Sequence, residues 1–93
     1  MSDIVVTHEP EASRFVARVD GVESECVYRL QGDTAVFVHT EVPPSLQGRG
    51  VAAALVRTAL QWARESALRV RPACSYVAVY MRRHPATLDL LDR

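Results

Sequence analysis

The first forty residues alternate between apolar and polar side chains with the two-residue period of half-buried β-strands. The segments that follow this pattern are Asp3–Glu9, Ser13–Val19, Val22–Leu30 and Thr34–Val42. The dipeptides Asp20-Gly21 and Gly32-Asp33 have the composition of tight turns between strands. The pattern therefore predicts an antiparallel meander of three or four strands.

The polar positions of this meander predict which face meets solvent. Arg14 and Arg18 fall opposite Glu23 and Glu25 when the hairpin closes, so we expect cross-strand ion pairs on that face. The segment Thr34–Val42 is almost continuously apolar at its start, which indicates a strand that is covered on both faces.

The second half of the chain changes to the period of amphipathic helices. Pro43-Pro44 ends the strand pairing because proline has no N–H to donate, and we expect the regular helix to begin near Arg49. Further along, the pattern predicts a strand, a helix and one or two final helical turns at Leu68–Cys74, Ser75–His84 and Ala86–Asp92. The order β-β-β-β-α-β-α predicts an α/β or α+β domain with one mixed, mostly antiparallel sheet of about five strands.

Two glycines stand where the long helix begins, in the run Gln47-Gly48-Arg49-Gly50-Val51-Ala52. Glycine costs a helix interior about 1 kcal/mol relative to alanine, and the residues that follow are strong helix formers. The first N–H groups of a helix are unpaired and lie at the positive end of its dipole. The glycines therefore predict a site where an anion, above all a phosphate, approaches bare backbone.

Composition narrows the function further. The eleven basic residues are all arginine and are balanced by eleven acidic residues, which argues against a nucleic-acid binder.

No apolar run approaches the roughly 20 residues that span a bilayer, and the N-terminus does not have the pattern of a signal peptide. A length of 93 residues predicts a single domain, residues 1–93. Two cysteines are too few for a disulfide framework, so we expect the protein in the reducing cytoplasm. The histidines and cysteines have no metal-ligand spacing, so no metal is predicted.

The segment Gln47–Ala52 matches the pyrophosphate signature R/Q-x-x-G-x-G/A of the GCN5-related N-acetyltransferase (GNAT) superfamily. The stretches HTEVPPSLQGRGVAAALV and RVRPACSYVAVYMRRHP more closely resemble its very small, single-domain members, the YjdJ-type predicted acetyltransferases. The resemblance covers residues 36–91 and implies a minimal GNAT fold, acetyl-CoA as the acyl donor and an amine as the acceptor.

The resemblance also implies where acetyl-CoA binds. The backbone amides that would hold its pyrophosphate are those of Gln47, Gly48, Arg49, Gly50, Val51 and Ala52. The main chain of Glu41 and Val42 would bind the pantetheine arm. The thioester would enter a splayed gap between this strand and the neighbouring strand Leu68–Cys74. In larger members of the superfamily, helices after the first strand form a wall of the acceptor site. The tight turns Asp20-Gly21 and Gly32-Asp33 leave no room for such helices, so the acceptor side is expected to be open.

Cys74 is the first candidate for chemistry near the thioester. It closes a strand and precedes a helix, whose N-terminus favours the thiolate. Cys74 is therefore a candidate covalent acetyl carrier or acid/base group, and the alternative is a small buried apolar residue. His39 and Glu41 share a strand face and are candidate general bases. Their alternatives are a hydrogen-bonded histidine and a solvated carboxylate.

Other polar residues near the cofactor have two interpretations each. Tyr80 is the candidate acid for the departing thiolate, and Tyr76, one turn earlier, is placed with the cofactor; both are equally compatible with core packing. Arg49, Arg82 and Arg83 are candidate partners for the phosphates of coenzyme A, although the last two also fit a solvated helix end. Cys26 is read as core, and His8 as surface.

We therefore predict a small acetyl-CoA-dependent N-acetyltransferase whose amine acceptor is unidentified and is possibly a protein. The transfer is either direct or through Cys74. The alternatives are a non-catalytic acyl-CoA-binding or regulatory module and an interaction domain without cofactor. We expect no nucleic-acid or membrane partner, and a monomer or a weak homodimer.

Overall fold

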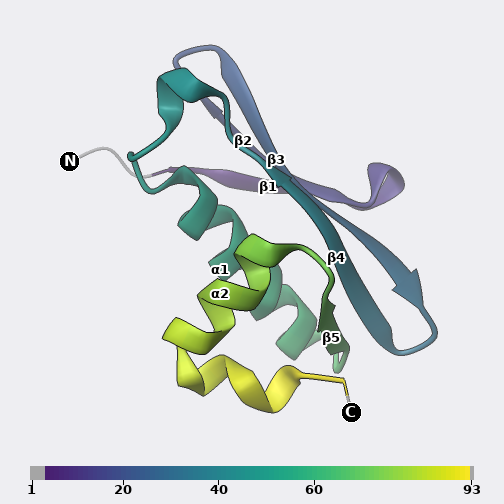
Figure 1. The fold of residues 1–93 in the computed structure, drawn as a ribbon. Helices are drawn as coiled ribbons and strands as arrows, with labels where there is room; N and C mark the ends of the chain where they lie inside the picture. Colours follow the sequence, from purple (N-terminus) through teal and green to yellow (C-terminus); the bar gives the residue numbers. More distant parts are fainter. Residues whose placement is uncertain (1–3, 93) are drawn as a thin grey trace.

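A five-stranded sheet carries both helices on one face, and its other face is left uncovered by helices in the described residues (Figure 1). The computed structural model describes residues 4–92. The strands are β1 (Val6–Glu9), β2 (Arg14–Val19), β3 (Val22–Gln31), β4 (Thr34–Glu41) and β5 (Arg69–Pro72). The helices are α1 (Val51–Glu65) and α2 (Ser75–Arg83), and the 3₁₀ turns are η1 (Pro10–Ala12), η2 (Pro44–Leu46) and η3 (Pro85–Leu90).

The strands follow one another across the sheet in sequence order. The first four pair antiparallel, and β5 pairs parallel with β4 after the crossover through α1. This arrangement confirms the predicted fold class. The first predicted strand reaches back to Asp3, which lies outside the described residues, and regular pairing begins at Val6.

A β-bulge in β4 decides which of its side chains face the helices. Tyr28 pairs with Phe37, but Val27 pairs with His39, so Val38 is an extra residue on β4. The bulge reverses the alternation of faces along the rest of the strand. Thr40 therefore lies on the helix-covered face with its partner Cys26, which is fully buried. His39 and Glu41 lie on the uncovered face.

The core fills the space between the sheet and the two helices. α1 contributes a buried stripe that includes Val51, Leu55 and Ala59, as its periodicity predicts. α2 contributes Val77 and Met81 to the same cluster. None of the helices in residues 4–92 combines the length and the apolar character needed to cross a membrane.

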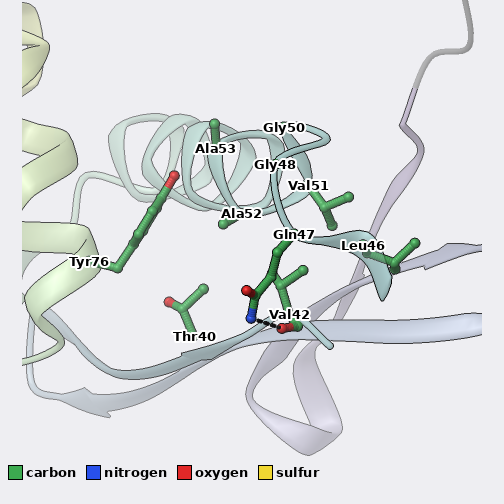
Figure 2. Close-up of a pocket in the computed structure, with 10 residues that line it drawn as sticks. All are labelled: Thr40, Val42, Leu46, Gln47, Gly48, Gly50, Val51, Ala52, Ala53 and Tyr76. Carbon is green, nitrogen blue, oxygen red and sulfur yellow. Dashed lines mark hydrogen bonds between the residues drawn. The ribbon is translucent and has the colours of Figure 1, made fainter. Parts of the chain in front are cut away.

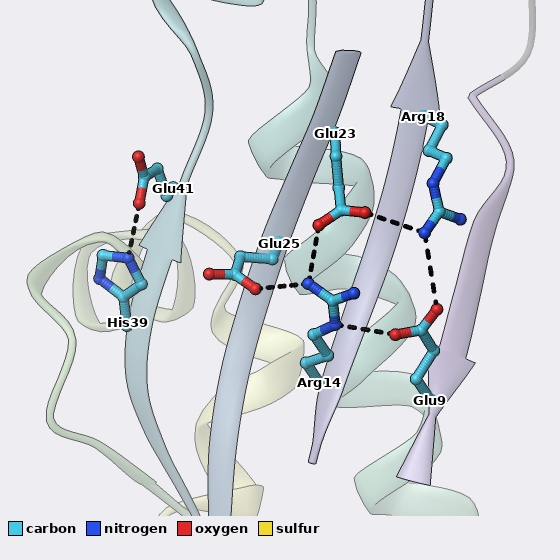
Figure 3. Close-up of polar contacts among 7 residues, drawn as sticks. All are labelled: Glu9, Arg14, Arg18, Glu23, Glu25, His39 and Glu41. Atoms are coloured by element: carbon cyan, nitrogen blue, oxygen red, sulfur yellow. Dashed lines mark hydrogen bonds and ion pairs between the residues drawn. The ribbon is translucent and has the colours of Figure 1, made fainter. Parts of the chain in front are cut away.

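The uncovered face carries a network of ion pairs (Figure 3). The guanidinium of Arg14 lies 2.8 Å from carboxylate oxygens of Glu9, Glu23 and Glu25, and Arg18 binds Glu23 at the same distance. The predicted cross-strand pairs are thus confirmed, with Glu9 as an additional member. Arg14 holds the pKa of Glu23 below its ordinary value, mainly through their hydrogen bond.

The structure corrects several boundaries and environments. α1 begins at Val51 rather than near Arg49, because Gly50 takes the left-handed conformation (φ 79°) at the cap position. The C-terminal segment is a 3₁₀ turn up to Leu90, after which Leu91 bridges to Val70 beside β5. The start of β4 is buried on both faces, as its apolar run predicts, because Ala35, Val36 and Phe37 are all buried, although no helix of residues 4–92 covers the outer face. Val36 is only 4% exposed, and it lies between two arginines, Arg29 and Arg71, in the strand register.

His8 is also not a simple surface residue. Its ring stacks on Phe15 with centroids 4.2 Å apart, and it meets the edge of Trp62. Its Nε2 lies 2.7 Å from the hydroxyl of Tyr28. Partial burial lowers the pKa of His8 below its ordinary value of 6.5, so the folded state favours the neutral ring.

We therefore expect the free energy of unfolding to decrease at acidic pH because of the protonation of His8. The unfolded chain binds a proton at this residue more readily than the folded one, so stability is lost as the pH falls below 6.5. The variant His8→Phe keeps the stack on Phe15 without titrating, and its melting temperature should fall less than that of the wild type between about pH 7.5 and pH 5. Scanning calorimetry at both pH values checks this. His84→Gln, at an exposed histidine, is the control. Identical pH dependence in wild type and His8→Phe would contradict the prediction.

Candidate functional site

The first turn of α1 borders a groove of about 380 Å³ that lies between this helix, the end of β4 and the start of α2 (Figure 2). Seven lining residues are ones that the sequence assigned to the cofactor: Val42, Gln47, Gly48, Gly50, Val51, Ala52 and Tyr76. Three lining residues were missed, namely Thr40, Leu46 and Ala53. The signature motif is thus open to a cavity.

The backbone around the motif presents several unpaired donors. In the described residues, no protein acceptor takes the amide N–H groups of Gly48, Gly50, Val51, Ala52 and Ala53. The amides of Gln47 and Arg49 differ, because they donate to the carbonyls of Pro44 and Leu46 at 3.3 Å. The donors available to an anion are therefore a subset of the predicted run, extended by one residue into the helix.

The two glycines explain why these donors are accessible. Gly48 and Gly50 have φ values of 81° and 79°, a region that residues with a Cβ rarely adopt. A Cβ at either position would meet no protein atom within 4 Å. The glycines therefore permit the turn and leave open space in front of the helix N-terminus, where the dipole favours negative charge.

Gln47 has a structural role that the sequence did not predict. Its side-chain Nε2 donates to the carbonyl oxygen of Val42 at 3.1 Å (Figure 2). This bond ties the loop before α1 to the end of the strand. It also occupies a carbonyl that was predicted to meet the pantetheine arm.

The groove lies next to a gap between β4 and β5. Their ladder ends at the pair Phe37–Pro72, and the last backbone bond between the two segments runs from the Cys74 N–H to the Phe37 carbonyl at 2.8 Å. β4 continues to Glu41 without a partner on this side. The predicted splayed gap is therefore present, and Thr40 and Tyr76 line the groove beside it (Figure 2).

Cys74 stands at this gap, at the N-cap position of α2. Its thiol is partly buried and lies 3.5 Å from the Thr40 hydroxyl. Burial raises the pKa of Cys74, but the Thr40 hydroxyl and the amides of Val77 and Tyr76 outweigh this effect, so the net pKa is lowered. Cys74 therefore ionises to the thiolate more readily than an ordinary cysteine does.

Of the two tyrosines, the structure places Tyr76 at the groove. Its ring is 39% exposed and points from α2 toward the first turn of α1 (Figure 2). Burial raises the pKa of Tyr76, with Tyr80 adding to the rise and Arg83 opposing it, so the hydroxyl is protonated at neutral pH. Tyr80 instead stacks on His84 with centroids 3.9 Å apart and lines a separate small cavity.

The predicted arginines do not converge on the groove. Arg49 pairs with Asp20 in the β2–β3 turn at 3.1 Å and lines a neighbouring cavity of about 220 Å³. Arg82 and Arg83 are exposed at the end of α2, and neither forms an ion pair within residues 4–92. Arg83 is nonetheless close enough to influence the pKa of Tyr76.

The candidate bases lie on the opposite side of β4 from the groove. His39 Nε2 is 3.1 Å from a carboxylate oxygen of Glu41, and both side chains are more than half exposed (Figure 3). Glu25 pairs directly with Glu41 across the strands. Ligand atoms of Glu25, His39 and Glu41 lie within 4.8 Å of one another, and Arg14 already binds Glu25. His39 and Glu41 belong to the part of β4 that extends past its ladder with β5, so these two form the outer rim of the gap, whereas Glu25 lies on β3.

Comparison with known proteins decides the family. The family model described as GCN5-related N-acetyl-transferase matches residues 14–90, which is most of the chain. The chain belongs to the GCN5-related N-acetyltransferase family. The predicted family is thereby confirmed, and acetyltransferase-type function follows from it.

Individual relatives agree with this GNAT assignment. Protein NATD1 of Xenopus tropicalis is 32% identical over 87 residues, which cover 90% of this chain and 80% of the relative. Human Protein NATD1 is 33% identical over 85 residues, covering 88% and 75%. The solution structure of a GCN5-like protein from Staphylococcus aureus matches 99% of this chain and 91% of its own with a TM-score of 0.76. At 23% identity, that likeness shows the GNAT fold alone.

The free amides give a residue-level prediction for this GNAT chain. Addition of coenzyme A should shift the amide NMR signals of Gly48, Gly50, Val51, Ala52 and Ala53 most strongly, because these N–H groups have no protein acceptor. A two-dimensional ¹H–¹⁵N titration measures this. Gly32, in a remote turn with a similar φ, is the internal reference. Shifts spread evenly over the loop, or centred on Gln47 and Arg49, would contradict the assignment.

Proposed function

We propose that this protein is an acetyl-CoA-dependent N-acetyltransferase that transfers an acetyl group to an amine. The observation that carries the proposal is the set of unpaired amides at the start of α1, opening onto a groove that continues to the β4–β5 gap. A pyrophosphate on these amides would be stabilised by direct hydrogen bonds and by the helix dipole.

The rest of the groove suits the acyl donor. The unpaired edge of β4 beyond Phe37 offers backbone groups to the amide-containing pantetheine arm. The thioester then reaches the gap, where Thr40 and Cys74 lie. Acetyl-CoA supplies an activated carbonyl whose leaving group is a thiolate. The protonated hydroxyl of Tyr76 is positioned at the groove to donate to that thiolate, which gives Tyr76 the acid role rather than Tyr80.

The acceptor is proposed to approach from the uncovered sheet face. Glu41 and His39 stand at the outer rim of the gap, and a carboxylate and an imidazole there can attract a cationic amine and take its proton. The uncovered sheet face accommodates an amine carried by a protein. Transfer is direct or passes through Cys74. In the reducing cytoplasm, which we propose as its location, both cysteines remain thiols.

A second candidate function is a non-catalytic acyl-CoA-binding module. The open acceptor side favours it, since no helix of residues 4–92 covers that face. Both candidates bind coenzyme A, so binding does not separate them. Release of free thiol from acetyl-CoA in the presence of a panel of amines does, because a binding module would release thiol only at the uncatalysed rate.

Substitution of one motif glycine should separate ligand binding from folding. In Gly50→Ala the left-handed φ strains the turn and the new methyl enters the groove, so we expect affinity for coenzyme A to fall about tenfold, or ~1.4 kcal/mol. Gly32→Ala has a comparable positive φ in a remote turn and is the matched control. Isothermal titration calorimetry and thiol release report binding and turnover. Equal affinity in the two variants would count against the proposed site.

The outer-rim residues should control the acceptor step. In Glu41→Gln, and separately in His39→Ala, we expect kcat/KM for the amine to fall about 100-fold or more, with the affinity for acetyl-CoA unchanged. Glu65→Gln, at an exposed carboxylate on α1, is the control. The measurement is a pH–rate profile for each variant. If both variants keep the wild-type profile and rate, neither residue is the general base.

A further inference from the structure

Three side chains form a hydrogen-bond chain behind the groove. The Cys74 sulfur lies 3.5 Å from the Thr40 hydroxyl oxygen, and that oxygen lies 3.7 Å from the Cys26 sulfur. The three residues come from the start of α2, from β4 and from β3, so the hydrogen-bond chain runs along the helix-covered face of the sheet. Thr40 is the only one of them that lines the groove.

The chemistry of these groups allows the chain to run in either direction. A hydroxyl donates one hydrogen and accepts others, and a thiol is a weak donor and a weak acceptor. With Cys74 as a thiol, its S–H donates to Thr40, whose O–H donates to Cys26. With Cys74 as a thiolate, the Thr40 O–H turns to the anion and the Cys26 S–H donates to Thr40. Ionisation of Cys74 therefore leaves each donor with an acceptor.

We propose that Thr40 is a positioning residue: its hydroxyl, backed by the Cys26 thiol, holds the Cys74 sulfur as a nucleophile that takes the acetyl group from the thioester. The acyl step rests on the proposed function, whereas the activation of the thiol does not. This assigns the transfer to the Cys74 route rather than to the direct one.

The surroundings distinguish the two cysteines. Burial raises the pKa of Cys26 to about 11, with the Thr40 hydrogen bond opposing the rise and Cys74 and Glu25 adding to it. Cys26 therefore stays protonated and serves as the donor. Cys74 faces the Thr40 hydroxyl and, behind it, Cys26 on the sheet side, and it faces the amides of Tyr76 and Val77 at the start of α2.

The covalent step balances as follows. Cys74 loses its proton to solvent, and its thiolate attacks the thioester carbonyl carbon of acetyl-CoA to form a new S–C bond. The C–S bond to coenzyme A breaks, and its electron pair leaves on the coenzyme A sulfur, which takes a proton from Tyr76. The amine then attacks the acetyl-Cys74 carbonyl, the C–N bond forms, and the S–C bond breaks so that Cys74 leaves as the thiolate. The amine proton passes to Glu41 or His39 and from there to solvent, and Tyr76 regains a proton from solvent.

Alkylation of Cys74 tests the hydrogen-bond chain Cys74–Thr40–Cys26, called the relay below, without any acyl donor. The rate of modification by iodoacetamide, located by peptide mass spectrometry, is followed against pH in the wild type and in variants. We expect Thr40→Val to raise the midpoint by about one pH unit and to slow alkylation near neutral pH about fivefold to tenfold. Thr40→Ser, which keeps the hydroxyl, should stay within about twofold of the wild type. Thr58→Val on α1 is the control for a remote threonine, and calorimetry verifies that each variant is folded.

A second measurement tests the acyl step. Incubation with acetyl-CoA, acid quenching and intact mass analysis should show one acetyl group on the wild type and Thr40→Ser, much less on Thr40→Val, and none on Cys74→Ala. An unchanged alkylation profile in Thr40→Val overturns the relay. Wild-type turnover of an amine without any acetyl-Cys74 overturns the covalent step and leaves the proposed function standing. Absence of coenzyme A binding in calorimetry overturns the proposed function and the acyl step together.

Discussion

β4 is bound along its length by β3, but β5 accompanies it for only half of that length. The parallel ladder starts at Thr34–Arg69 and ends at Phe37–Pro72, whereas β4 runs on to Glu41. Pro72 has no N–H for a further ladder bond, and the Cys74 amide makes the last link to Phe37 before the chain turns into α2. The gap that results opens on the same stretch of β4 that leads into the motif. The position of every candidate group depends on this early separation of two strands.

The start of α1 is held at the gap by packing and by polar contacts. Val51 and Leu55 are almost completely buried under the sheet, which fixes the helix axis. Gln47 ties the preceding loop to Val42 at the end of β4. The unpaired amides are therefore presented by a rigid element, and an anion that binds them does not have to order the loop first. The two glycines contribute to this pre-organised site, because the backbone there takes a positive φ and the ligand needs open space.

Much of this could be read from the sequence, since periodicity and turn composition are local properties. The alternation of residues 13–30 predicts the hairpin and its ion pairs, and the motif predicts the groove-lining backbone. The bulge at Val38 could not be predicted, because nothing in a nearly continuous apolar run marks the extra residue. That one residue places Thr40 inward and His39 and Glu41 outward, so the sequence showed that the last two share a face but not which face. Tyr76 and Tyr80 were likewise inseparable, because both fit the same helical spacing.

The uncovered sheet face raises the question of how so small a fold stays stable without a second layer. Val16 is 1% exposed although no helix of residues 4–92 covers it. The Arg14 side chain of β2, only 23% exposed, lies in the same face and binds three carboxylates, one on β1 and two on β3. Single surface ion pairs contribute little, but an arginine stem that covers apolar surface while its head links β1, β2 and β3 replaces part of a missing layer. His39 and Glu41 make no ion pair with this network, as Figure 3 shows. The same face can thus be polar enough to remain uncovered and still leave the rim of the gap available to an acceptor.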